Sequence, residues 1–269
     1  MTTPDGRHAI VTGGSRGLGR SIAALMAARG YQVSLIARDA AQLQTAVNSM
    51  PGQVSSQAAD VTDTGQLTHA VANLVARSGP CDVLVATAGA ARPGYFLELD
   101  NDVFRSQMEL NYFGVLNAVR AVTPSMVERK TGSIVAIAST AALIGVYGYA
   151  AYAPSKFAVR GLMEVLRSEL KPHGVHVGCA FPPDMDTPGL AAENLTKPEE
   201  GARISAGIRA RDPDDVARAV LRGIEHHRFL ITADPQTAAL ARVAGLFGPL
   251  INRLMDRTVD KVRHSHSHG

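Results

Sequence analysis

The chain of 269 residues lacks the features that would place it across a membrane, outside the cell or on a nucleic acid. No uninterrupted apolar stretch reaches the roughly 18 residues of a spanning helix, and no basic segment followed by an apolar core stands at its start. We therefore expect neither a spanning helix nor secretion. The formal net charge is only +3 and the basic residues do not cluster with aromatic ones, so no nucleic-acid partner is expected.

Cysteine is also scarce. Cys81 and Cys179 lie far apart inside apolar runs, which indicates small buried side chains and not a disulfide or a metal pair. A reducing, cytoplasmic compartment fits this usage, and we expect no metal site. By contrast, hydrophobic residues make up 46% of the chain and are spread along it, which is enough for one large domain.

Seven short apolar runs alternate with longer segments whose apolar residues recur every three or four positions. Runs that are apolar at consecutive positions are typical of parallel strands buried on both faces. The alternation predicts an α/β fold of the Rossmann type, a doubly wound seven-stranded parallel sheet flanked by helices. The runs are 8–12, 31–37, 53–58, 81–87, 132–139, 175–181 and 228–233.

A glycine-rich stretch, Thr12–Gly19, reads TGGSRGLG and connects the first run to a helical pattern. Glycine permits a sharp turn from strand to helix and lets backbone N–H groups approach a phosphate closely. A strand before the turn and a helix after it are the context in which such a turn binds a dinucleotide. The candidate cofactor contacts here are Gly13, Ser15, Arg16, Gly17, Leu18 and Gly19.

The spacing of these glycines, Thr-Gly-x-x-x-Gly-x-Gly, resembles the short-chain dehydrogenase/reductase family, and three later motifs match that family in order. They are Asn111 in LNYFG, Ser139 after an apolar strand, and Tyr152 with Lys156 in YAPSK. Tyr152 and Lys156 are four residues apart in a helical pattern, so they share one face. The resemblance extends over about residues 7–235 and implies that these four residues are catalytic.

The chemistry that the resemblance implies is carbonyl reduction, which needs a hydride at carbon and a proton at oxygen. A tyrosine with a pKa of about 10 exchanges protons poorly near pH 7. We expect the Lys156 ammonium, together with the positive nicotinamide of the oxidised cofactor, to lower the pKa of Tyr152, where about three units would correspond to roughly 4 kcal/mol. The resemblance also implies that Lys156 binds the nicotinamide ribose, that Ser139 holds the substrate oxygen and that Asn111 supports a proton relay. Tyr147 and Tyr149 lack a lysine four residues on, so we expect them to line the substrate pocket or to pack.

The second apolar run ends at Arg38, where proteins that use NAD usually have an acidic residue. Arg38 and Arg16 could hold a 2′-phosphate, which favours NADP(H). Asp39, an acidic residue directly after Arg38, would favour NAD, although we expect it to cap the next helix. Asp60 and Val61, after the third run, resemble the family's adenine contact; a loop turn is the alternative for Asp60.

One family motif is incomplete. Where the family has Asn-Asn-Ala-Gly or Asn-x-Ala-Gly, residues 86–89 read ATAG, without the first asparagine. Ala88 and Gly89 keep the small side chains that let the backbone pass close to the cofactor. We expect cofactor binding to survive, and how the sheet is braced at this point stays open.

The segments FPPDMDTPG at 181–189 and ENLTKP at 193–198 are similar to those of the 3-ketodihydrosphingosine reductases. By resemblance, Pro182 and Thr187 contact the nicotinamide end of the cofactor, and the irregular stretch 182–213 is a substrate lid. The resemblance implies an NAD(P)H-dependent reductase that converts the ketone of a long-chain 3-keto lipid, such as 3-ketodihydrosphingosine, to a secondary alcohol. Other 3-oxoacyl or hydroxysteroid-like substrates stay open, as does a catalytically idle cofactor-binding scaffold.

Residues 1–235 form the expected catalytic domain, and residues 236–269 a tail of the same unit. The tail pattern predicts an amphipathic helix interrupted near Gly248 and Pro249, with basic residues largely off the apolar stripe. The stripe favours a packing surface in a homodimer or homotetramer, and a shallow membrane contact is the alternative. Its members are Leu240, Val243, Phe247, Leu250, Leu254 and Val259.

Overall fold

Seven parallel strands form one sheet in the order β3-β2-β1-β4-β5-β6-β7. The structure, a computed structural model, describes residues 6–206 and 209–266, without the side chains of residues 246, 247 and 263–266. The strands are β1 (His8–Thr12), β2 (Gln32–Ala37), β3 (Val54–Ala58), β4 (Cys81–Ala86), β5 (Gly132–Ile137), β6 (Val175–Ala180) and β7 (Leu230–Ile231). The predicted doubly wound sheet is confirmed.

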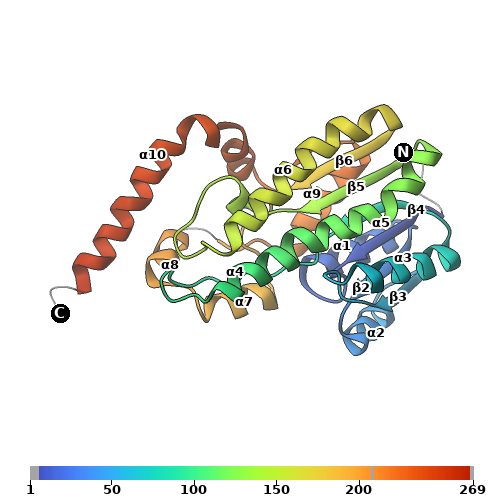
Figure 1. Cartoon of the computed structure of the whole chain (residues 1–269), viewed down its shortest axis with the longest axis horizontal. Helices are drawn as coiled ribbons and strands as arrows, with labels where there is room; N and C mark the ends of the chain where they lie inside the picture. The colour runs from blue at the N-terminus through green and yellow to red at the C-terminus, as the bar shows by residue number, and fades with distance from the viewer. Residues whose placement is uncertain (1–5, 207–208, 267–269) are drawn as a thin grey trace.

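Helices cover both faces of this sheet (Figure 1). Side chains alternate across a strand, so Ile10 packs in one core and its neighbours Ala9 and Val11 pack in the other. The first core includes side chains of α3 (Thr64–Ser78), α5 (Gly114–Arg129) and α6 (Tyr152–Leu170). The second core includes side chains of α1 (Gly17–Ala28), α2 (Ala40–Asn48) and α9 (Pro213–Glu225).

The strand order reverses between β1 and β4, which are adjacent in the sheet although β2 and β3 separate them in sequence. Ligands of doubly wound sheets bind at such a switch point, beyond the carboxyl ends of the strands. Both cysteines are buried and free, as expected. The fold therefore directs attention to the loops after β1 and β4.

Two helical segments differ from the sequence pattern near this edge. Between α4 (Asn101–Met108) and α5 the helix passes through one π-helical turn, η1 (Glu109–Phe113), which periodicity does not predict. The stretch 182–213, expected to be irregular, contains α7 (Pro188–Asn194) and α8 (Glu199–Ser205). That expectation is wrong because proline at the first position of a helix starts the helix and does not break it.

The C-terminal helix α10 (Pro235–His266) continues through Pro249, so the predicted interruption is wrong. A proline inside a helix removes one hydrogen bond and bends the axis, but the helix continues when its flanking turns have other support. Figure 1 shows α10 changing direction and extending past the sheet, and it packs against α8. The side chain of Phe247, a member of the predicted stripe, lies outside the described part of the chain.

Candidate active site

The glycine turn after β1 packs directly against the loop after β4. Gly13 has a φ of +68°, and a Cβ there would lie 2.9 Å from the backbone of Ala88. A Cβ at Gly19 would collide with the Gly13 carbonyl oxygen. Only glycine fits these two positions, because a Cβ at either would lie 2.9 Å or less from backbone atoms. The positive φ of Gly13 favours glycine as well.

Helix α1 begins in this turn without a side-chain cap. Arg16 is the N-cap residue, its side chain makes no capping hydrogen bond, and the first turn has no acidic residue. The first N–H groups of α1 and the positive end of its dipole therefore suit an anion such as a pyrophosphate. Leu18, in the first turn of α1, is buried in the second core and anchors this end of the helix to the sheet. The residues present fit a dinucleotide.

Thr87 supplies the brace that the missing asparagine of the ATAG motif left open. Its hydroxyl donates to the Thr12 carbonyl oxygen, and the Thr12 hydroxyl accepts from Ala88 N at 3.4 Å. These bonds tie the end of β4 to the end of β1. Sequence reasoning missed this role, although a hydroxyl residue at the second motif position was the available signal.

Asn111 lies in the π-helical turn and is fully buried. Its Oδ1 accepts from Ala90 N at 3.0 Å and its Nδ2 donates to Ala90 O at 3.1 Å, so the side chain fixes the loop after β4. A Cβ at Gly89 would lie 2.8 Å from Asn111 Oδ1 and 3.2 Å from Lys156 Nζ. Gly89 thus passes between two of the predicted catalytic side chains, and π-turns often occur at functional sites.

Tyr152 and Lys156 share one face of α6, as the four-residue spacing predicts. Lys156 Nζ lies 5.7 Å from the centroid of the Tyr152 ring. The Ser139 hydroxyl accepts from Ala141 N at 3.1 Å and is near enough to the Tyr152 side chain to act on its pKa. The structure therefore brings Ser139, Tyr152 and Lys156 together beside the glycine turn.

Burial dominates the effect of the protein groups on the pKa of Tyr152. Burial raises it, and the Ser139 side chain opposes the rise only partly. Lys156 does not lower it, because its ammonium donates to Ile137 O at 2.9 Å and is itself desolvated, which lowers the Lys156 pKa to about 8. Tyr152 is thus a neutral phenol, the protonation state that a proton donor requires.

Arg38 is the cation that β2 presents at the cofactor edge. Its side chain is 71% exposed and its Nη1 lies 3.9 Å from Asp60 Oδ2. Arg16 is also exposed, at the other side of the turn. Asp39 accepts from Ala41 N and Gln42 N, both at 2.9 Å, so the predicted cap of α2 is confirmed.

Asp60 and Val61, the predicted adenine contacts, also have structural roles. Asp60 Oδ1 accepts from Thr62 N at 2.9 Å and from Thr62 Oγ1 at 2.8 Å, which makes the loop turn that was the alternative interpretation. Val61 is buried in the core, and its carbonyl oxygen accepts from Asn117 Nδ2 at 3.0 Å. Only the second Asp60 oxygen faces Arg38.

The segment after β6 reaches back over the cofactor cradle. Thr187 Cγ2 would be 3.6 Å from a Cβ at Gly17, so Thr187 lies on the glycine turn. The Pro182 carbonyl oxygen accepts from Thr140 N at 3.1 Å, next to Ser139. The predicted nicotinamide contacts, Pro182 and Thr187, therefore lie between the glycine turn and the catalytic serine.

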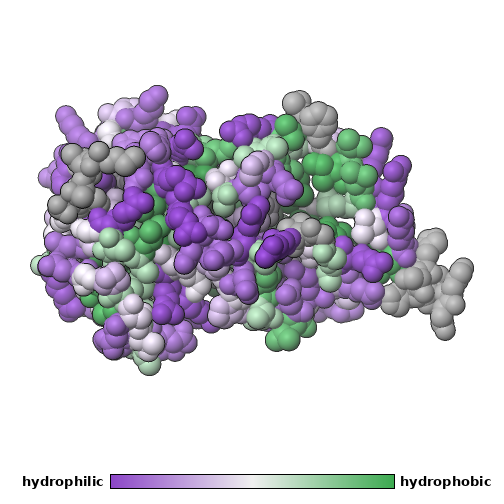
Figure 2. Space-filling view, turned by 180° about the vertical axis from the view of Figure 1, so that it is seen from behind, coloured by the Kyte–Doolittle hydropathy of each residue, from purple (hydrophilic) through white to green (hydrophobic). Residues whose placement is uncertain are grey.

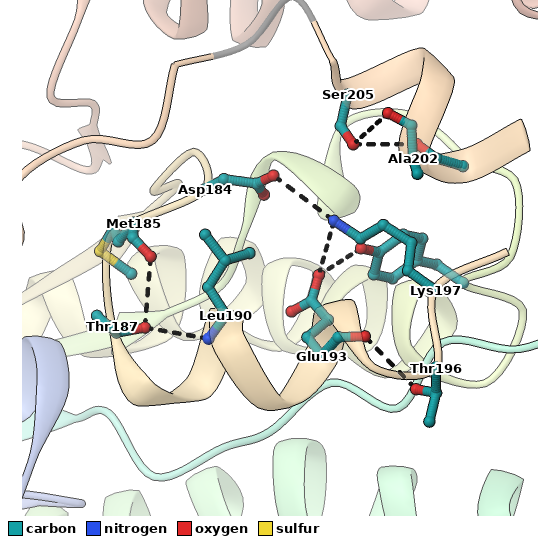
Figure 3. A network of polar contacts seen from close by, with 11 residues as sticks. Asp184, Met185, Thr187, Leu190, Glu193, Thr196, Lys197, Ala202 and Ser205 are labelled. Carbon is teal, nitrogen blue, oxygen red and sulfur yellow. Dashed lines mark hydrogen bonds and ion pairs between the residues drawn. The ribbon is translucent and has the colours of Figure 1, made fainter. Parts of the chain in front are cut away.

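A buried lysine fastens the lid (Figure 3). Lys197 has a side chain only 5% exposed, with Nζ 3.6 Å from Glu193 Oε1 and 3.9 Å from Asp184 Oδ2. The Tyr149 hydroxyl donates to Glu193, whose pKa burial raises, and the Tyr149 ring lies 6.0 Å from the ring of Tyr152. These motif residues, which the sequence could only match to a subfamily, thus connect the predicted lid to the start of α6.

A cavity of about 1110 Å³ opens beside this network. Tyr147 and Tyr149 line this cavity, and lining a pocket was one of the two roles expected for them. The opposite wall is α10, through Met255 and Val259, a contribution that sequence reasoning missed because periodicity says nothing about where a helix docks. Within the described ranges no three metal-ligating side chains gather in one place.

Comparisons with known proteins agree with this geometry. The profile of the short chain dehydrogenase family matches residues 7–198. A 3-ketodihydrosphingosine reductase of Dictyostelium discoideum is 38% identical over 257 residues, covering 88% of this chain and 77% of the relative. A 3-dehydrosphinganine reductase of Danio rerio is 37% identical, covering 91% of this chain and 76% of its own.

Solved structures show the same fold. An actinorhodin polyketide ketoreductase with NADPH is 31% identical, with a TM-score of 0.75 over 89% of this chain and 94% of that one. A short chain dehydrogenase/reductase of Burkholderia phymatum in complex with NAD is 25% identical, with a TM-score of 0.82 over 93% and 96% of the two chains. Since the family profile spans most of the sheet and the catalytic helix, this chain belongs to the short chain dehydrogenase family.

Proposed function

We propose that this protein is an NADPH-dependent reductase that converts the ketone of a long-chain 3-keto lipid to a secondary alcohol. The observation that carries the proposal is the position of a phenol, Tyr152, close to Ser139 and 5.7 Å from Lys156 Nζ, at the edge of a dinucleotide cradle. The cradle consists of the uncapped start of α1 and the glycines around it.

Each catalytic side chain has a distinct task in this proposal. A reduced nicotinamide bound at the cradle would supply the hydride. Ser139 binds the ketone oxygen and Tyr152 donates its phenolic proton to that oxygen as the alcohol forms. Lys156, held to β5 through Ile137 O, binds the cofactor ribose, and Asn111 keeps the Ala90 loop in place beside it.

The preference for NADPH rests on charge. Arg38, directly after β2, and Arg16, in the glycine turn, are both exposed, and Asp39 is occupied in capping α2. Asp60 lies at 3.9 Å from Arg38, which leaves the guanidinium available for a 2′-phosphate through charge-assisted hydrogen bonds. The structural relatives include complexes with NADPH and with NAD, so the charge pattern is the discriminating feature.

The substrate class rests on the relatives and on the lid. Relatives from two organisms are 3-ketodihydrosphingosine and 3-dehydrosphinganine reductases. The segments 181–189 and 193–198, which contain the Lys197 network, resemble those of the 3-ketodihydrosphingosine reductases. The test is NADPH consumption with long-chain 3-ketones, 3-oxoacyl thioesters and hydroxysteroid-like ketones. Fastest turnover of the long-chain 3-ketones supports the proposal. Cofactor binding without turnover of any ketone would favour the idle scaffold.

We further propose a cytoplasmic homo-oligomer that touches a membrane surface through α10. None of the described helices is both long enough and apolar enough to cross a bilayer. Leu250 and Leu254 keep 53% and 54% of their surface exposed, and Arg253 and Arg257 are exposed beside them, a combination that suits anionic lipid. Val165 on α6, 55% exposed, supports a separate contact between subunits.

A further inference from the structure

The cavity beside the lid is far more apolar and larger than a ketone group requires. Its volume of about 1110 Å³ exceeds the roughly 300–1,000 Å³ of ordinary small-ligand pockets. Apolar side chains come to it from four parts of the chain, the loops 94–98 and 145–150, the start of α6 and the outer half of α10. They include Tyr95, Phe96, Leu97, Phe157, Met255 and Val259.

The cavity adjoins the catalytic centre. Its inner wall includes Tyr149 and Ala153, and Ala153 directly follows Tyr152 on α6. Tyr149 and Ala153 pack in a small cluster against the Tyr152 ring. A ligand whose ketone lies at Tyr152 could therefore extend past Tyr149 into the cavity.

The outer rim is exposed and apolar. Phe96 and Leu97 keep 65% and 92% of their surface exposed, which is unusual for large apolar side chains next to a cavity. Figure 2 shows hydrophobic surface gathered at the end of the molecule that carries α10, beside a hollow. Two of the tyrosine hydroxyls in the lining are engaged, since Tyr95 and Tyr147 both donate to Glu200.

We propose that this cavity binds the hydrocarbon tail of the ketone substrate, with α10 as its outer wall. The inference rests on the proposed function and deepens it, because it assigns tail length to residues far from the catalytic centre in sequence. Each methylene buried in such a cavity is expected to improve binding about fourfold. Specificity for long chains would then come from α10 and the 94–98 loop and not from the catalytic residues.

The first test is a series of 3-ketones with one head group and tails of increasing length, at concentrations where they are monomeric and without vesicles. In the native protein kcat/KM rises with tail length until the cavity is filled. Met255→Asp lowers the ratio of kcat/KM for the longest to the shortest ketone at least tenfold, and Val259→Asp does the same. The matched control is Leu254→Asp, on the same helix but outside the cavity lining, which keeps the native ratio.

A native rate independent of tail length would overturn the proposal. An equal loss in Met255→Asp and Leu254→Asp would also overturn it, because the effect would then be general damage to α10. If no ketone of the series is reduced at all, the proposed function fails, and the binding test below still decides whether the cavity takes hydrocarbon.

The second test measures binding without turnover. The chain contains no tryptophan, so Met255→Trp places a single tryptophan in the cavity wall and Leu254→Trp places one outside it. A long-chain 3-ketone with bromine atoms on its tail should quench the fluorescence of Met255→Trp strongly and that of Leu254→Trp weakly. Equal quenching in both variants, or none in Met255→Trp, would contradict the proposal.

Discussion

Lys156 Nζ donates to the carbonyl oxygen of Ile137 at 2.9 Å, so this lysine is held to the end of β5 and not to the phenol of Tyr152. Its ammonium is buried, which lowers the pKa of Lys156 to about 8. In this arrangement the lysine acts on the cofactor side of the site, and the tyrosine keeps its proton. The two residues therefore titrate separately, which gives the first prediction.

The pH dependence of reduction follows from the Lys156 pKa. Above pH of about 8 the lysine loses its positive charge, so kcat/KM for ketone reduction should fall as pH rises through that value. Tyr152 does not contribute in this range because its pKa is raised. The Lys156→Met variant should be slow and show no change between pH 7 and 9. A native profile as flat as that of the variant would remove Lys156 from the essential groups.

Cofactor choice should depend on Arg38. Arg38→Asp reverses the charge that faces the 2′-phosphate, so the affinity for NADPH should fall by about 2 kcal/mol, roughly 30-fold, with little effect on NADH. The control is Arg77→Asp, which makes the same charge change on the exposed side of α3. Titration calorimetry with both cofactors measures the difference. Equal losses for NADPH and NADH would mean that Arg38 has only a structural role.

The Thr87 brace should contribute to stability. Thr87→Val keeps the side-chain shape and removes the hydroxyl that donates to Thr12 O, so the free energy of unfolding should fall by about 1 kcal/mol. For a chain of this size that corresponds to a decrease in Tm of about 2–4 °C. Thr87→Ser retains the donor and should melt close to the native protein. An unchanged Tm in Thr87→Val would show that the backbone contacts alone hold β1 and β4 together.

Membrane contact through α10 is tested by sedimentation with anionic vesicles. The native protein should sediment with them, and added salt should weaken binding because Arg253 and Arg257 contribute electrostatically. Leu250→Asp combined with Leu254→Asp should abolish sedimentation, whereas Val165→Asp on α6 should not. If the α10 variant instead changes the mass in solution and the native protein never binds vesicles, α10 is an oligomer surface.

The sequence patterns were sufficient to predict the strands of the sheet and which polar residues lie at its edge. Buried strands and glycine turns are local signals, so the β1 turn and the Tyr152–Lys156 pair could be predicted from spacing. The helices within residues 182–213 could not be predicted in this way, since proline at a helix start and proline in a loop look alike in sequence. The Lys197 network and the α10 wall of the cavity depend on where helices dock, which no local pattern records.

The direction of the Tyr152 pKa could not be predicted for a related physical reason. A lysine one turn away suggests a lowered pKa, but the result depends on how deeply both groups are buried and where the ammonium points. Here Ile137 O takes the ammonium, and desolvation dominates at both residues. The spacing of residues along the helix shows neither how deeply the two groups are buried nor where the ammonium points.

We propose that Tyr152 donates the proton that completes ketone reduction, and the Tyr152→Phe variant removes that donor. The substitution removes the hydroxyl and keeps the ring, so packing against Tyr149 and Ala153 is preserved. The decisive measurement is single-turnover NADPH oxidation with a long-chain 3-ketone, alongside the Kd for NADPH. We expect a rate at least about a hundredfold lower with an unchanged Kd, the scale expected for loss of a general acid. A rate within a few-fold of the native protein would contradict it.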